Sequence, residues 1–344
     1  MWLIYSERLD IMIILGLGGS NHDFSACIVK DGEILCMIED ERITRKKHGV
    51  GIGLELAKGF SRRYCCESLG IGIDDFDLIV ANDILNNVMY KRLNKKTHLI
   101  NHHVAHAASC YYPSPFNESA ILIVDAVGSK RLVDSKNMYD TISFGIGNGN
   151  KLDIIENIVG KNIEGTDYVE NSLGIFYSII TDIIGFGEHQ EGKTMGLAPY
   201  GTNKYYKMLN KHVRQIGYGN IEIGKKDIEE LLSYKEIIDS VRDEQESFYI
   251  KADFAWAAQT ILEENLIYLC KHLKKITGLS NLCIAGGIAL NSVSNYKIYR
   301  QKIFERVFIQ PACGDNGTSI GSALYGYYSM MNMFRNIEEC LEDK

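Results

Sequence analysis

Several features are missing from this 344-residue sequence. No apolar run approaches the length of about twenty residues that a membrane-spanning helix needs, and no signal peptide precedes the first expected strand. The nine cysteines are an odd number and include no Cys-x-x-Cys pair, unlike a disulfide framework or a zinc knuckle. We therefore expect a reduced, cytoplasmic protein that does not enter a membrane.

A basic surface is also missing. The formal net charge is −7, and the one basic cluster, residues 42–48, is short. This charge excludes the electrostatic footprint of a protein that binds DNA or RNA. Residues 42–48 either hold a small anionic ligand or form a solvated turn. Proline is scarce as well, and all four prolines lie in the segments considered below: Pro113, Pro115, Pro199 and Pro311.

A pattern of strands occurs twice. Each copy has a buried strand, a turn of small residues, a second strand, a hairpin turn and a third strand. The expected strands are 12–17, 24–29 and 33–39 in the first copy, and 120–125, 141–146 and 151–158 in the second. Two further buried strands are expected at 282–285 and 307–310, and helices at 54–69, 173–184 and 252–277.

This duplication predicts the fold class. A duplicated α/β protein of this kind resembles the superfamily of actin, Hsp70 and the sugar kinases (the ASKHA fold, ribonuclease H-like), in which two subdomains enclose a central cleft. The first turns of the two units would face each other there and could hold phosphate and metal. A chance recurrence of hairpins is the alternative. The expected divisions are an N-terminal extension (1–11), a first subdomain (12–118), a second subdomain (119–330) and an acidic tail (331–344).

Three histidines lie within five residues: His102, His103 and His106. In a helix, His102 and His106 share one face and can bind one divalent metal, whereas His103 lies on another side and supports the pocket. A buried helix with hydrogen-bonded histidines is the alternative. Asp315 follows an expected strand and precedes a helix, which makes it the best third ligand. Two nitrogens and one carboxylate suit iron(II), zinc or manganese.

Seven segments of the chain carry a resemblance. They are Gly-Gly-Ser-Asn-His-Asp-Phe-Ser-Ala (18–26), Glu-Arg-Ile-Thr-Arg-Lys-Lys-His (41–48), Asn-His-His-Val-Ala-His-Ala (101–107), Ser-Leu-Gly-Ile-Phe-Tyr-Ser (172–178), Glu-Gly-Lys-Thr-Met-Gly-Leu-Ala-Pro-Tyr-Gly (191–201), Gly-Gly-Ile-Ala-Leu-Asn-Ser (286–292) and Gln-Pro-Ala-Cys-Gly-Asp-Asn-Gly-Thr (310–318). Together they resemble the N-terminal part of the O-carbamoyltransferases of nodulation-factor and antibiotic biosynthesis. They are more distantly similar to the TsaD proteins, which transfer threonylcarbamoyl to tRNA. Each segment alone is a weak signal, whereas seven in order are a strong one.

The resemblance implies an activity and a metal. A carbamoyl group would pass from carbamoyl-adenylate to the hydroxyl, or amine, of a small natural-product or sugar acceptor. The metal, Fe²⁺ ahead of Zn²⁺ or Mn²⁺, would be held by His102, His106 and Asp315, and Asp125 would complete the metal or phosphate site. His22 would act as general base, since imidazole can take the proton that an attacking alcohol loses. A turn residue bonded to its own backbone is the alternative for His22.

The same resemblance assigns further residues. Lys47 would join His22 in catalysis and, with Arg45, would hold the phosphate or the acceptor. Lys193 is a similar candidate. ATP or carbamoyl-adenylate would be the nucleotide ligand, and Gly286, Gly287 and Asn291 would line its adenosine pocket.

The sequence departs from the family pattern in two places. The family continues with a YrdC-like domain that makes the adenylate from carbamoyl phosphate and ATP, and the tail from Met330 is too short to be that domain. We therefore expect a separate YrdC-like subunit as partner; a different acyl-adenylate and a loss of catalysis are the alternatives. Ala126 stands where the family's turn usually has glycine, which alters the pocket rather than the fold.

Two other functions stay open. One is a small-molecule kinase of the same superfamily, with Asp23 as its carboxylate in the first turn. The other is a regulatory or scaffold protein without chemistry, against which the intact set of expected site residues argues. A role on tRNA fits the negative charge poorly. We expect no nucleic-acid partner, allow for a homodimer, and place acceptor or partner contacts in residues 202–250.

Overall fold

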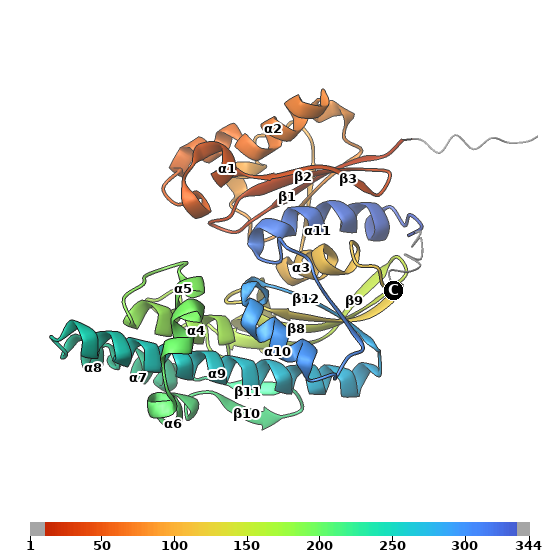
Figure 1. Ribbon diagram of the computed structural model, residues 1–344. Coiled ribbons are helices and arrows are strands. Elements are labelled where there is room, and N and C mark those ends of the chain that lie inside the picture. Colours follow the sequence, from red (N-terminus) through yellow and green to blue (C-terminus); the bar gives the residue numbers. More distant parts are fainter. Residues whose placement is uncertain (1–10, 336–344) are drawn as a thin grey trace, which may run out of the picture.

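The computed structural model describes residues 11–335 of the chain. Most of the expected N-terminal extension (1–11) and most of the expected acidic tail (331–344) therefore lie outside the described residues. No helix within residues 11–335 combines the length and the apolar character that crossing a membrane requires. The described chain folds into two mixed sheets with helices between and around them (Figure 1).

The first sheet is built by the N-terminal repeat. Its first three strands form an antiparallel meander, and the last two run parallel to the first strand. Helices α1 (Asp40–Thr44) and α2 (Phe60–Leu69) follow the meander, and α2 packs against β2 and β3. The strand order is β3 (Glu33–Glu39), β2 (Ser25–Lys30), β1 (Ile13–Gly18), β4 (Leu78–Asn82) and β5 (Thr97–Ile100).

The second sheet repeats this topology, which confirms the expected duplication. Again an antiparallel meander is extended by two strands parallel to its first strand. The corresponding order is β9 (Lys151–Lys161), β8 (Lys136–Asn148), β6 (Glu118–Val124), β12 (Asn281–Ala285) and β13 (Arg306–Ile309). An additional strand, β7 (Lys130–Val133), pairs with the start of β8.

Two helices lie between the sheets, and each packs on the sheet of the other repeat. Helix α3 (His102–Tyr111) follows β5 but contacts β6, β8, β9 and β12. Helix α11 (Thr318–Tyr325) follows β13 but contacts β1, β2 and β4. The two helices also pack against each other, and Figure 1 shows them stacked at the centre of the molecule. The starts of both helices therefore meet at the junction of the two repeats.

A layer of helices covers the outer face of the second sheet. Its centre is α9 (Glu244–Thr277), against which α4 (Leu173–Ile183), α5 (Glu191–Leu197) and α10 (Ser292–Arg300) pack. Residues 202–250 add a small outer group, also built on α9. This group contains α6 (Tyr206–Asn210), β10 (Arg214–Gly217), β11 (Asn220–Glu222), α7 (Lys225–Ser233) and α8 (Lys235–Asp239).

Some elements differ from the sequence-based expectation. The helix expected at 54–69 is interrupted: a short 3₁₀ segment, Gly53–Lys58, ends at Gly59, whose φ of +59° is left-handed, and α2 begins after it. Strands β4, β5, β7, β10 and β11 were not predicted, and β8 begins five residues earlier than expected, at 136 instead of 141. The bounds of the remaining expected strands agree with the observed bounds to within three residues.

Candidate metal site and the histidine cluster beside it

Helix α3 starts with a tightly fixed N-terminus. The side chain of Asn101 caps it by accepting a hydrogen bond from the Val104 N–H at 3.1 Å, and its amide donates to Asp140 at 2.9 Å. The first helical N–H, that of His102, donates to Asp83 and to Ser129. Because the first turn is held on several sides, the histidine side chains leave the helix in fixed directions.

Two of the three histidines converge, as the four-residue spacing predicts. The Nε2 atoms of His102 and His106 lie 3.0 Å apart, and both rings are fully buried. His103 is on another side of the helix, where its Nδ1 lies 2.6 Å from the Ser143 hydroxyl. Burial lowers the pKa of His103 to about 3, so this ring is neutral and packs as a structural side chain.

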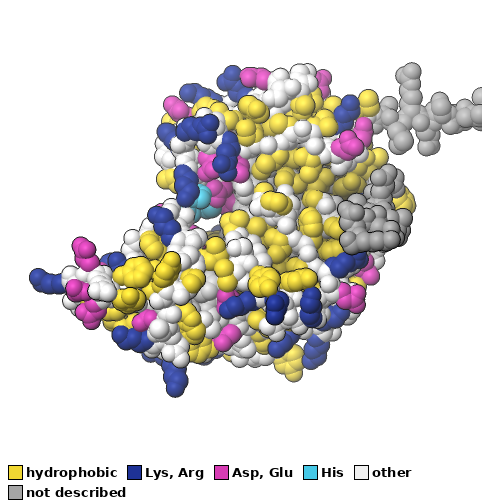
Figure 2. All heavy atoms as spheres, viewed as in Figure 1, with side chains coloured by type: hydrophobic (Ala, Val, Ile, Leu, Met, Phe, Trp, Pro, Cys, Tyr) yellow, Lys and Arg dark blue, Asp and Glu magenta, His cyan; other side chains and the backbone are white. Residues whose placement is uncertain are grey.

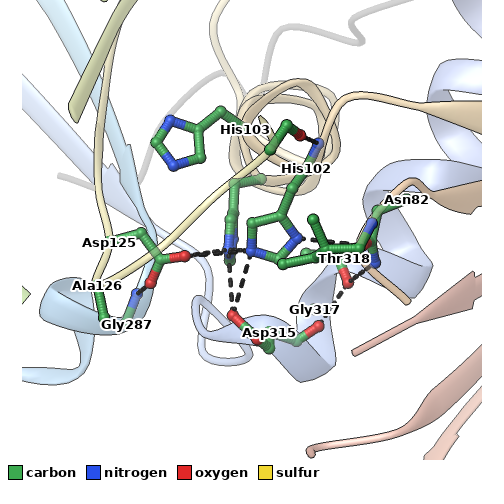
Figure 3. Close-up of polar contacts among 12 residues, drawn as sticks. Asn82, His102, His103, Asp125, Ala126, Gly287, Asp315, Gly317 and Thr318 are labelled. Carbon is green, nitrogen blue, oxygen red and sulfur yellow. Dashed lines mark hydrogen bonds and ion pairs between the residues drawn. The ribbon is translucent and has the colours of Figure 1, made fainter. Parts of the chain in front are cut away.

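Two carboxylates complete a four-ligand cluster around the paired Nε2 atoms (Figure 3). Asp125 follows β6, and its Oδ2 lies 3.1 Å from His102 Nε2 and 3.8 Å from His106 Nε2. Asp315 follows β13, and its Oδ1 lies 3.4 Å from each Nε2. One ligand atom of each residue lies within 4.8 Å of the other three. The four residues expected to bind metal are thus brought together from both repeats.

The surrounding hydrogen bonds orient His102 for a metal. The Asn82 amide, at the end of β4, donates to Gly19 O at 2.8 Å and to Thr318 Oγ1 at 3.0 Å. Its oxygen therefore faces His102 Nδ1 at 3.2 Å and can only accept, which puts the ring proton on Nδ1 and leaves the Nε2 lone pair free. The Gly287 N–H similarly holds Asp125 Oδ1, at 3.1 Å, so that Oδ2 faces the histidines.

The cluster fits a divalent cation. Two imidazole nitrogens that face each other at 3.0 Å cannot both present a lone pair without a cation or a proton between them. Burial lowers the pKa of His102, but the Asp315 and Asp125 carboxylates outweigh burial and raise it to about 10. Two nitrogen and two oxygen ligands suit Fe²⁺, Zn²⁺ or Mn²⁺. The cluster could therefore hold one such ion in place of the proton.

His22 lies beside this cluster, at the first turn of the N-terminal repeat. Its Nε2 is 4.0 Å from Asp315 Oδ2, and its Nδ1 donates to Asp23 Oδ2 at 2.9 Å. Burial lowers the pKa of His22, but the hydrogen bond to Asp23 and the charge of Asp315 outweigh it and raise the pKa to about 9. A cation in the cluster would neutralise Asp315 and bring the pKa down again. The side chain thus bonds Asp23 rather than its own backbone.

Two further histidines, neither assigned a role from the sequence, lie next to His22. His48 Nδ1 donates to the other oxygen of Asp23 at 2.8 Å. His189 reaches over from the loop between α4 and α5, and its ring centre lies 4.5 Å from that of His22 and 5.0 Å from that of His48. His48 belongs to a recognised segment and could have been found there, whereas His189 precedes one by two residues and gives no sequence signal of its own.

The expected cationic residues lie farther out. Arg45 and Lys47 are exposed in the turn after α1, and Lys193 is exposed on α5 with its Nζ 5.8 Å from the ring centre of Phe186. Figure 2 shows a hollow between the two halves with histidine and acidic side chains inside it and Lys and Arg side chains around it. Among the described residues, the three cations make no hydrogen bond or ion pair with the four-ligand cluster, and their roles stay predictions.

The residues expected around adenosine have structural contacts. Gly286 has a φ of +98°, and a Cβ there would come within 2.3 Å of Val124 O, so close strand approach requires glycine. Asn291 is buried; its amide donates to Gln259, and its oxygen accepts from Gln259 and from the Ser294 N–H. With Gly287 holding Asp125, these three residues shape the second-repeat side of the site, and contact with adenosine stays a prediction.

Comparisons with known proteins agree with this architecture. HypF from T. kodakarensis shares the fold with a TM-score of 0.55 at 15% identity, over 96% of this chain and 49% of that protein. Component A of the (R)-2-hydroxyglutaryl-CoA dehydratase of Acidaminococcus fermentans gives a TM-score of 0.50 at 14% identity, over 93% of this chain and 99% of that one. At these identities the likeness shows the fold alone, and it confirms the expected ASKHA class.

Sequence comparisons also bear on the family. Nodulation protein NolNO of Sinorhizobium fredii is 26% identical over 88% of this chain and 46% of its own length. An uncharacterized protein of Synechocystis is 29% identical over 95% of the chain and 58% of its own length. The chain thus spans about half the length of these curated relatives. The model of the carbamoyltransferase N-terminus matches residues 83–324, well over half of the chain. The expected resemblance is confirmed: this chain belongs to the carbamoyltransferase family, through the N-terminal domain of that family.

Proposed function

We propose that this chain transfers a carbamoyl group from carbamoyl-adenylate to the hydroxyl or amine of a small natural-product or sugar acceptor. The observation that carries the proposal is the placement of His22, whose Nε2 lies 4.0 Å from Asp315 Oδ2 at the edge of the four-ligand cluster. A base and a cation site side by side suit acyl transfer, in which the acceptor hydroxyl or amine loses a proton while AMP leaves the carbamoyl carbon.

Each site residue has a defined role in this proposal. His102, His106, Asp125 and Asp315 would hold the metal, which when bound supplies positive charge for the adenylate phosphate. His22 Nε2 would take the acceptor proton, because its Nδ1 is engaged by Asp23. The cations Arg45, Lys47 and Lys193 would attract the anionic nucleotide to the hollow between the halves. Fe²⁺ is the metal that we favour, by the family resemblance.

We infer that the carbamoyl-adenylate comes from a YrdC-like unit outside this sequence. The matched family model is that of an N-terminal domain, and the relatives NolNO and the Synechocystis protein are about twice as long as the part matched. A separate subunit that uses carbamoyl phosphate and ATP would supply the adenylate. The site formed by His22 and the four-ligand cluster would then carry out the second of two steps, the transfer of the carbamoyl group to the acceptor.

The test combines the formation of carbamoyl-adenylate with the transfer of the carbamoyl group. The iron-loaded chain, a YrdC-like protein, carbamoyl phosphate, ATP and a panel of sugars and polyhydroxylated compounds are incubated without oxygen, and products are identified by mass spectrometry. We expect a carbamoylated acceptor only in the complete mixture. The absence of product with every acceptor, while metal is bound and adenylate is formed, would contradict the proposal. Phosphorylated acceptor in its place would indicate a kinase.

Replacement of His22 by alanine should lower kcat/KM for carbamoyl transfer by about 10² to 10⁴-fold, the usual contribution of a general base. The bound metal should stay unchanged, because His22 supplies none of the four ligand atoms. His98→Ala, a half-buried histidine on β5, is the matched control and should keep full activity. Equal rates for His22→Ala and the control would remove His22 from the mechanism.

The kinase alternative is less well supported by the geometry. Its catalytic carboxylate would be Asp23, and both oxygens of Asp23 accept hydrogen bonds from imidazole rings, at 2.9 and 2.8 Å. Those contacts lower the pKa of Asp23 against the effect of burial, which makes the carboxylate a weaker base.

A further inference from the structure

The Asp23 carboxylate bridges two imidazoles. His22 Nδ1 lies 2.9 Å from Oδ2 and His48 Nδ1 lies 2.8 Å from Oδ1. A carboxylate has only acceptors, so each neutral ring must carry its proton on Nδ1 and leave its Nε2 without one. For His22 this puts the free lone pair on the nitrogen that faces Asp315 and the four-ligand cluster.

His48 is fixed to Asp23 a second time through the backbone. The Asp23 N–H donates to His48 O at 2.8 Å, while the His48 N–H donates to Glu41 at 2.8 Å. The Nε2 of His48 is buried and has no hydrogen-bond partner among residues 11–335. The Nδ1 bond to Asp23 is therefore the one ring hydrogen bond of His48 in the described structure, and its direct effect is to hold that carboxylate.

The backbone at this point is held in an unfavourable conformation. Asp23, His48 and His189 have φ values of 54°, 56° and 56°, in the left-handed region that residues other than glycine rarely adopt. Such positions persist only where their surroundings enforce them, and they gather at functional sites. Here three of them, from three separate segments, meet around the single carboxylate of Asp23 and the His22 ring.

His189 belongs to the second repeat, and its ring lies beside the rings of His22 and His48, which belong to the first repeat. Its ring centre is 4.5 Å from that of His22 and 5.0 Å from that of His48. Together the contacts restrain His22 on two sides, by Asp23 at Nδ1 and by His189 at the ring.

We propose that Asp23 and His48 form a positioning pair that fixes the His22 ring as its Nδ1–H tautomer and directs Nε2 toward the reacting atoms. Asp23 orients His22, and His48 orients Asp23. Neither touches the substrate in this proposal, which rests on the proposed function of His22 as base. The pair resembles other cases in which a carboxylate sets the tautomer of a histidine that acts on its far side.

The test replaces Asp23 by asparagine, which adopts left-handed backbone as readily as aspartate and should therefore fold. An amide offers an acceptor to one imidazole and a donor to the other, so one of the two rings must change tautomer. Ring ¹⁵N spectra of the zinc-loaded protein, which is diamagnetic, should show His22 protonated at Nδ1 in the wild type and a changed pattern in Asp23→Asn. His48→Asn, which also suits the left-handed position, should leave the tautomer but loosen the ring.

In the carbamoyl-transfer assay, Asp23→Asn should lower kcat by about 10² to 10³-fold and His48→Asn by about 10-fold, with KM for the acceptor nearly unchanged. Bound zinc should stay at the wild-type level in both variants. Wild-type ring spectra or wild-type kcat in Asp23→Asn would overturn the inference. If the wild-type protein transfers no carbamoyl group, the proposed function fails, and the ring spectra still decide whether Asp23 sets the tautomer of His22.

Discussion

Replacement of Asp315 by asparagine should weaken metal binding by about 100-fold or more, beyond the 10- to 100-fold that the loss of an outer-shell partner costs. The Oδ1 of Asp315 lies 3.4 Å from the Nε2 of both His102 and His106, so it faces the centre of the four-ligand cluster. An amide removes the negative charge and supplies a poorer ligand, while the two imidazoles keep their positions. Elemental analysis after anaerobic loading with Fe²⁺ or Zn²⁺ measures the change, from one ion per chain to almost none.

The control is Asp182→Asn, an exposed carboxylate on α4 that is no part of the cluster. It should bind metal as the wild type does, and both variants should unfold cooperatively. An Asp315→Asn protein that retains a full equivalent of metal would show that the ion binds elsewhere. The group Asp23, Glu41 and His48 is the other place where ligand atoms lie close enough together among the described residues.

Replacement of Gly321 by valine should prevent folding, and Gly321→Ala should destabilise the protein by at least about 3 kcal/mol, the upper end of the usual cost of overpacking. Gly321 lies on α11 where this helix crosses α3, and a Cβ there would come within 1.8 Å of Ala105 O and 2.9 Å of the Ser109 backbone nitrogen. Both are backbone atoms, so no side-chain movement can relieve the clash. Urea unfolding followed by circular dichroism measures the loss.

Gly196→Ala is the matched control for this substitution. Gly196 lies in α5, and a Cβ there would meet no atom within 4 Å, so alanine should stabilise the helix by up to about 1 kcal/mol. Since α3 carries His102 and His106, Gly321→Ala should also weaken metal binding, whereas Gly196→Ala should not. A Gly321→Ala protein within about 0.5 kcal/mol of the wild type would contradict the close crossing of α3 and α11.

The duplicated architecture was predictable because its signals are local. Hairpin turns at 30–32 and 147–150 separate strands whose apolar residues are continuous, and these features occur in both repeats. Strand β4 begins with the apolar run 78–81, which is typical of a buried strand but is too short to be told from a helix segment, and the four residues of β5 show neither a hairpin signal nor clear alternation. The break in the helix expected at 54–69 comes from the left-handed conformation of Gly59, a choice that the sequence pattern left open.

The site was predictable only in part, for a related reason. The spacing of His102 and His106 determines a shared helix face, so their convergence follows from the sequence. The contributions of Asn82 and His189 depend on the packing of segments that are remote in the chain. Gly286 shows the same limit, because a glycine pair after a strand can make room for a ligand or for a neighbouring strand. Here the Val124 carbonyl occupies that space.

Anomalous X-ray diffraction at the iron edge, from crystals grown without oxygen in the presence of Fe²⁺ and AMP, shows directly whether the four-ligand cluster binds iron beside the nucleotide. We expect one anomalous peak between His102 Nε2, His106 Nε2, Asp125 and Asp315, with the AMP phosphate beside it and His22 Nε2 facing the same point. A peak at Asp23, Glu41 and His48, or no peak in crystals that bind AMP elsewhere, would contradict this expectation.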